Sequence, residues 1–71
     1  MITLTEQEKA YITAYYADGF NPFLLDDNTR AGGVSLLQKA DDLCYTLDAY
    51  DEVGDSLMEW FIDKCRKEGL V

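Results

Sequence analysis

The chain has 71 residues, a formal net charge of −8 and no histidine. We expect a single domain over residues 1–71, because a hydrophobic share of 48% and an aromatic share of 13% exceed those of a disordered acidic tail. No stretch approaches the ~18 apolar residues of a membrane span. The negative charge disfavours direct binding to membranes or nucleic acid, and the N-terminus lacks signal-peptide features, which predicts a cytoplasmic protein.

The first predicted helix covers residues 6–17. Thr5 is a good N-cap, and Glu8 three residues later completes a capping box, in which each side chain bonds the other residue's backbone N–H. Gly19 predicts the stop, because glycine adopts the left-handed conformation that ends many helices. The apolar positions that recur at helical spacing are Tyr11, Ile12, Tyr15 and Tyr16.

Residues 18–34 form the irregular part of the chain. Asn21 followed by Pro22 predicts a turn or a short helix start, with Asn21 as the cap. The pair Gly32–Gly33 predicts a flexible hinge before the next helix. Four apolar side chains are expected to fold back onto the core; they are Phe20, Phe23, Leu24 and Leu25.

The second predicted helix covers residues 36–50. Ser35 is its expected cap, and Gln38 completes a second capping box. One apolar face runs along four turns of this helix. Its positions are Leu36, Ala40, Leu43, Cys44, Leu47 and Tyr50.

The third predicted helix covers residues 55–67, with Asp51 or Asp55 as its cap. Cations crowd its last turn, where they favour the helix dipole, and Gly69 is a good residue for the C-terminal turn. The helix is apolar nearly all round, which is typical of a central helix. These apolar positions are Leu57, Met58, Trp60, Phe61, Ile62 and Cys65.

Three helical patterns and no β-alternation predict an all-α protein, a compact three- or four-helix domain. The short break near Gly54 predicts an antiparallel hairpin of the second and third helices. Cys44 and Cys65 both fall on apolar helical faces, so we expect buried reduced thiols, with a bridge between the two helices as the alternative.

Catalysis and cofactor binding are not expected. The chain lacks histidine, the usual general base, and contains none of the common nucleotide, hydrolase or zinc motifs. An EF-hand calcium loop needs glycine at its sixth position and oxygen ligands around it. Placing Gly54 there puts Ala49 at the first position and Trp60 at the twelfth, and placing Gly32 there puts Gln38 at the twelfth, so neither register works.

The strongest functional signal is a run of acids between residues 41 and 63, which contains no Lys or Arg. The eight acids are Asp41, Asp42, Asp48, Asp51, Glu52, Asp55, Glu59 and Asp63. If the third helix begins at Asp55, then Asp55, Glu59 and Asp63 form a ridge with a step of about 6 Å. Such a ridge could imitate a phosphate backbone, which carries one charge per roughly 3.4 Å of each strand. The alternative is an acidic face that serves only solubility.

A small, histidine-free, helical and strongly acidic domain resembles the phage-encoded DNA mimics, which include anti-CRISPR and anti-restriction proteins. The resemblance rests on chain length and on the charge run. It implies a non-enzymatic inhibitor that acts in the cytoplasm of the host cell on a protein with a basic nucleic-acid-binding surface. A monomer is favoured, because high net charge keeps copies of a small protein apart.

The expected partner-binding residues are the eight acids together with Tyr45, since Tyr16 and Tyr45 fall off the main apolar stripes. Tyr11, Tyr15 and Tyr50 are expected at the core margin. The rival interpretation is a structural or regulatory protein–protein interaction module, adaptor-like or antitoxin-like, that binds through the apolar segment 18–34.

Overall fold

The computed structural model describes residues 2–71. Within this range the chain forms the α-helices α1 (Glu6–Tyr15), α2 (Asp27–Leu47) and α3 (Leu57–Lys67), the short 3-10 helix η1 (Pro22–Leu24), and no strand. The all-α prediction is therefore confirmed for the described residues. The radius of gyration is 11.9 Å, close to the ~11 Å typical of a compact domain of this length. None of the helices in residues 2–71 combines the length and apolar character needed to span a bilayer.

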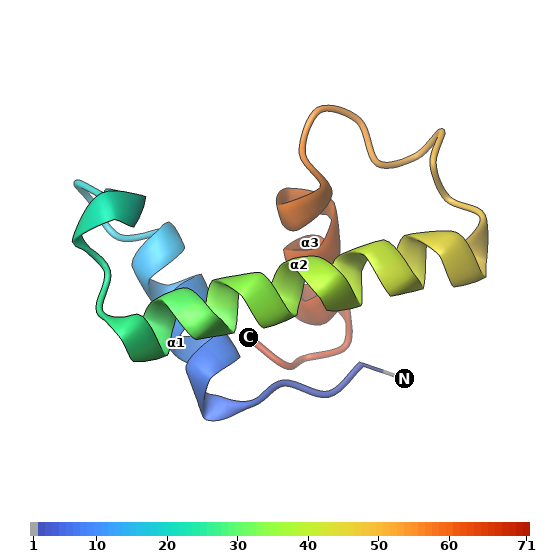
Figure 1. The fold of residues 1–71 in the computed structure, drawn as a ribbon. Coiled ribbons are helices and arrows are strands. Elements are labelled where there is room, and N and C mark those ends of the chain that lie inside the picture. Colours follow the sequence, from blue (N-terminus) through green and yellow to red (C-terminus); the bar gives the residue numbers. More distant parts are fainter. Residues whose placement is uncertain (1) are drawn as a thin grey trace.

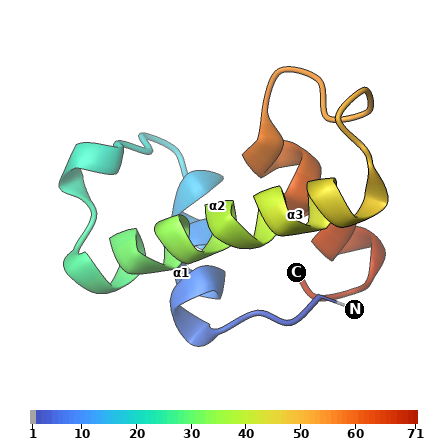
Figure 2. The same cartoon turned by 45° about the vertical axis from the view of Figure 1, so that its right-hand side comes forward.

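The long helix α2 is the centre of the arrangement and contacts both α1 and α3. Figures 1 and 2 show α2 running across the molecule, with α1 and α3 packed on it and crossing it. The predicted antiparallel pairing of the second and third helices is not confirmed. The connection between them, residues 48–56, is a long irregular loop rather than a tight turn.

The start of α1 is as predicted. The Thr5 hydroxyl accepts a hydrogen bond from the Glu8 backbone N–H at 3.2 Å, and the Glu8 carboxylate accepts one from the Thr5 N–H at 2.7 Å. The helix ends at Tyr15, two residues earlier than predicted, and Gly19 has the expected positive φ of 75°. This capping box is a local pattern, so the sequence alone was enough to locate it.

The start of α2 was predicted wrongly. The helix begins at Asp27, and its N-cap is Asp26, whose carboxylate accepts a hydrogen bond from the Thr29 N–H at 2.8 Å. Hydrogen bonding to Thr29 also lowers the pKa of Asp26, as expected for a carboxylate that caps a helix in its charged form. Ser35, the predicted cap, lies in the middle of α2.

Gly32 and Gly33 are helical residues rather than a hinge. A Cβ at Gly32 would lie 2.0 Å from the Gln7 carbonyl oxygen of α1, and a Cβ at Gly33 would lie 2.5 Å from the Tyr11 ring. Both glycines are buried. Glycine inside a helix is less stable than alanine, but here its missing side chain allows the backbones of α1 and α2 to approach closely. The packing of the two helices therefore outweighs the low helix propensity of glycine.

The end of α2 also differs from the prediction. The helix ends at Leu47, and Asp48 closes it in the left-handed conformation, with φ 50° and ψ 48°. Tyr50 therefore lies outside the helix and is 57% exposed, and Leu47 is exposed as well. Neither belongs to the buried face predicted for the second helix.

The cap of α3 is Ser56, whose hydroxyl accepts a hydrogen bond from the Glu59 N–H at 3.2 Å. The helix consequently begins at Leu57, and neither Asp51 nor Asp55 caps it. Its C-terminus is as predicted, because Gly69 has φ 76° and the Leu70 N–H donates to the Cys65 carbonyl at 3.0 Å.

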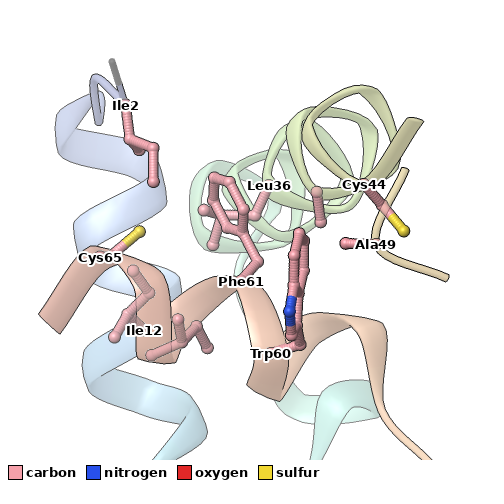
Figure 3. Packing of buried hydrophobic residues seen from close by; sticks show 10 residues of the cluster. Ile2, Ile12, Leu36, Cys44, Ala49, Trp60, Phe61 and Cys65 are labelled. Atoms are coloured by element: carbon pink, nitrogen blue, oxygen red, sulfur yellow. The ribbon is translucent and has the colours of Figure 1, made fainter. Parts of the chain in front are cut away.

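The hydrophobic core lies where α3 meets α2 and α1 (Figure 3). The central position of α3 is confirmed: Trp60, Phe61, Ile62 and Cys65 are all buried. The core also receives residues from α2, α1, the N-terminal segment and the 48–56 connection. These are Leu36, Ala40, Cys44, Ile12, Ile2 and Ala49.

Cys44 and Cys65 are both buried free thiols, as expected. Figure 3 shows them on opposite sides of Phe61, which rules out the alternative of a bridge between α2 and α3 in this fold.

The segment around η1 packs only in part. Asn21 caps it as predicted, with its side-chain oxygen accepting from the Phe23 N–H at 3.0 Å. Phe20 packs against Tyr11 and Tyr15, with ring centroids 6.1 and 5.3 Å away. Phe23 and Leu24, however, are 87% and 81% exposed, so the prediction that they fold onto the core is wrong.

Candidate interaction surfaces

The eight acids predicted for partner binding are all exposed, and we call them the acidic surface. Asp41 and Asp42 lie on the C-terminal half of α2, and Asp48 is its C-cap. Asp51, Glu52 and Asp55 lie on the 48–56 connection, and Glu59 and Asp63 lie on α3. The charge run is thus carried by three consecutive parts of the chain.

The acidic surface is not the continuous helical ridge that the sequence predicted. Asp55 precedes α3, so only Glu59 and Asp63 share a helical face, about 6 Å apart along the axis. Asp41 and Asp42 are adjacent on α2 and therefore point about 100° apart. The charges are distributed over α2, the connection and α3 instead of following one line.

Two of the acids are neutralised by cations from outside the acidic run. The Lys64 ammonium lies 2.8 Å from the Glu52 carboxylate, which also accepts a hydrogen bond from Trp60 Nε1 at 3.2 Å. Hydrogen bonds from Lys64 and then Trp60 hold the pKa of Glu52 below its ordinary value. Lys67 lies 3.2 Å from Asp63.

The other six acids make no ion pair within the described residues. They are Asp41, Asp42, Asp48, Asp51, Asp55 and Glu59. The unpaired charge therefore lies on the C-terminal half of α2, on the connection and on the first turn of α3.

Tyrosines accompany these charges. Tyr45 is 77% exposed and lies on the same face of α2 as Asp41, which precedes it by four residues. Asp48, the C-cap, follows three residues later. Desolvation, and then nearby groups that include Asp41 and Asp48, raise the pKa of Tyr50. Tyr16 is also exposed as expected, but the Arg66 guanidinium lies 4.5 Å from its ring centroid, so part of one face is covered.

An apolar groove of about 630 Å³ lies beside the acidic surface. We define it by Phe23 of η1, Val34 and Leu37 of α2, and Met58 of α3, with Tyr11 and Leu25 also lining it. Sequence reasoning expected exposed parts of Met58 or Trp60 as apolar anchors; Met58 is half-buried and lines the groove, whereas Trp60 is buried. Val34 and Leu37 were missed as surface residues. The sequence could have revealed their exposure, because Val34 and Leu37 lie outside the apolar face of α2 formed by Leu36, Ala40 and Cys44.

Glu8 is the most unusual ionisable group, because its side chain is completely buried. Its carboxylate accepts hydrogen bonds from the Thr5 N–H, from the Lys39 ammonium at 2.7 Å and from the Ser35 hydroxyl. Burial alone raises the pKa of Glu8, but the bonds from Lys39, Ser35 and Thr5 together outweigh burial and lower it. Every bond that Glu8 makes joins parts of this chain, which marks a structural role.

Among residues 2–71, no cluster of three or more Cys, Asp or Glu side chains has the geometry to hold a metal ion. The acidic surface and the apolar groove are the two candidate interaction surfaces. No family model, no curated protein and no solved structure matches the chain.

Proposed function

We propose that this protein is a non-enzymatic inhibitor that binds the basic nucleic-acid-binding surface of another protein. The observation that carries the proposal is the set of six exposed acids on α2, its C-cap, the connection and the start of α3, which make no ion pair with any of residues 2–71. Like charges so close together destabilise a fold, and a net charge of −8 on 71 residues leaves them uncompensated. Binding to a Lys/Arg-rich groove would relieve this repulsion.

The three-part distribution of the charge favours imitation of a nucleic-acid field rather than of one strand's regular spacing. Complementary charge mainly raises the rate of association and selects basic partners. A few desolvated contacts then set the dissociation rate, and Tyr45 is the best placed side chain in the acidic surface for such a contact. The resemblance to phage-encoded anti-CRISPR and anti-restriction proteins is consistent with this mode of action.

The experiment replaces Asp42, Asp51 and Asp55 together by Lys. All three are exposed, and within the described part of the chain none makes an ion pair or caps a helix, so the fold should survive. The matched control replaces Glu6, Asp18 and Glu68 by Lys, which changes net charge equally but outside the acidic surface. Partners captured by the wild-type protein should be retained by the control and lost by the first variant.

Duplex DNA should displace the protein from the captured partner, and binding should weaken steeply with salt, because screening acts over about 8–10 Å. The proposal is wrong if the Asp42/Asp51/Asp55 variant binds as well as the wild type, or if DNA and this protein occupy the partner together.

A second candidate function is the structural or regulatory interaction module. The exposure of Phe23 and Leu24 favours it, because isolated domains rarely leave two adjacent large apolar side chains in water beside an apolar groove. Replacing Phe23 and Leu24 by Ser tests it. Loss of partner binding that is insensitive to salt and to DNA would favour this second function over the first.

A further inference from the structure

The apolar groove and the acidic surface meet along α2. Leu37 lines the groove, and Asp41 follows one turn later on the same face of the helix, about 6 Å further along the axis. Val34, Leu37, Asp41 and Tyr45 form one exposed stripe that changes from apolar to acidic toward the C-terminus of α2.

Two acids also lie near the α3 residue of the groove in the sequence. Met58 lines the groove, and both Asp55 and Glu59, close to it in sequence, are exposed and make no ion pair in the described part of the chain. Figures 1 and 2 show η1 and the first turn of α3 on the same side of α2, and both elements contribute side chains to the lining of the groove.

Among the described residues that line the groove, the one cation, Arg30, already has partners within the chain. Arg30 donates to the Leu25 carbonyl at 2.9 Å, and its guanidinium lies 3.4 Å from Asp27. It lies near η1, away from Asp41. The field over the α3 end of the groove is therefore negative, while its floor and walls are apolar.

We infer that this groove binds an amphipathic basic helix of the partner protein, with apolar side chains against Val34, Leu37 and Met58 and Lys or Arg side chains beside Asp41, Asp55 and Glu59. Grooves of this kind accept helices that present apolar residues at i, i+3, i+4 and i+7. The inference rests on the proposed function in taking a basic partner, and it adds the apolar contacts that would set the dissociation rate.

Charge argues against two other occupants. A second copy of this chain would also carry a net charge of −8 and would bring acidic rims together. An anionic membrane surface repels the same rim. A basic helix satisfies both the apolar floor and the acidic rim.

The test uses three synthetic helical peptides of about 18 residues, which span about 27 Å, against the 33 Å long axis of the protein. The first carries a Leu stripe flanked by Lys, the second has every Lys replaced by Glu, and the third has every Leu replaced by Ser. Binding is followed by methyl and amide NMR shifts at Val34, Leu37 and Met58. The Leu/Lys peptide should shift these signals, and the other two should bind at least about tenfold more weakly.

Leu37→Gln should weaken binding of the Leu/Lys peptide at least about fivefold, a change comparable to losing part of one apolar anchor. Leu47→Gln is the matched control, since Leu47 is also an exposed leucine on α2 but does not line the groove, and it should bind as the wild type does. Circular dichroism of both variants checks that helix content is unchanged.

The inference is overturned if the Leu/Lys peptide leaves the groove signals unmoved, if the Glu peptide binds equally well, or if Leu37→Gln has no effect. Concentration-dependent dimerisation that Leu37→Gln abolishes would instead assign the groove to a second copy. The two proposals separate cleanly. If the peptide experiment fails but the Asp42/Asp51/Asp55 variant still loses its partner, the proposed function remains supported and the groove proposal is wrong. If the peptide binds as expected but that variant keeps its partner, only the groove proposal remains supported.

Discussion

Replacing Glu8 by Gln tests whether the buried charge cluster holds α1 on α2. The substitution keeps the shape of the side chain but removes its charge. The Lys39 ammonium loses its carboxylate partner and keeps its bond to the Thr3 carbonyl, at 2.8 Å. The amide oxygen in the Oε1 position can still accept from the Thr5 N–H and from Lys39, but the amide nitrogen in the Oε2 position cannot accept from the Ser35 hydroxyl, which must turn to become the acceptor.

The loss of unfolding free energy expected for Glu8→Gln depends on how deeply Glu8 and Lys39 are buried. Breaking a fully buried ion pair typically costs 3–5 kcal/mol. The Glu8 side chain is fully buried, but the Lys39 side chain is 34% exposed and can recover water, so we expect about 2–3 kcal/mol. A domain of this length has a free energy of unfolding of about 4–11 kcal/mol. The variant should therefore lose a large fraction of its stability, and Tm should fall by roughly 10–20 °C.

The difference between wild type and Glu8→Gln should depend on pH. The folded pKa of Glu8 lies below its unfolded value of about 4.3. Its contribution to stability is consequently present in full above that unfolded value and is lost as pH falls through the folded pKa. The two proteins should differ by a constant amount between about pH 5 and 7, and the difference should shrink progressively as pH falls below about 4.

Urea denaturation followed by circular dichroism measures these differences. Glu6→Gln is the matched control, because Glu6 lies on the same helix with a side chain that is 94% exposed and 3.8 Å from Lys9. It should change stability by less than about 0.5 kcal/mol. The reasoning is refuted if Glu8→Gln is as stable as the Glu6→Gln control, or if the difference from wild type persists unchanged at pH 3.

Three further predictions concern packing, the thiols and a helix end. Gly32→Ala should destabilise the protein by about 1–3 kcal/mol in urea denaturation, because the clash with the Gln7 carbonyl outweighs the gain in helix propensity; a stabilised variant would contradict the close crossing. Cys44 and Cys65 should react slowly with thiol reagents in the native protein, because both are buried and burial raises the pKa of the Cys65 thiol, whereas labelling as fast as in urea would show exposure. Asp48→Gly should raise the free energy of unfolding by about 0.5–1 kcal/mol, since Asp48 adopts a left-handed conformation that glycine accepts without strain; an unchanged or lower value would show that the Asp48 side chain contributes more than its backbone costs.

Local signals in the sequence were enough for part of the fold. The Thr5–Glu8 capping box, the Asn21 cap and the Gly69 stop were predicted correctly, because each depends on residues within a few positions of one another. The broad apolar surface of α3 predicted its central position for a similar reason, since a helix that is apolar all round must be covered on several sides.

The start of α2 could not be predicted in the same way. Gly32 and Gly33 indicate a hinge when read locally, and only the crossing with α1 explains why two glycines lie inside a helix. Serine is a common N-cap residue, yet the Ser35 hydroxyl donates a hydrogen bond to the carboxylate of Glu8, which is 27 residues away in sequence. Both errors came from contacts between α1 and α2.

The candidate surfaces also depend in part on the sequence alone and in part on the tertiary structure. The sequence by itself determined that the eight acids between residues 41 and 63 are exposed, because charged side chains without buried partners remain in water. Only the tertiary structure decided which of them stay unpaired, since Lys64 and Lys67 reach Glu52 and Asp63 through the fold of α3. It also decided that η1, α2 and α3 form a groove beside those charges. Periodicity along one segment specifies which side of a helix is apolar, whereas a groove exists only where side chains from several segments meet.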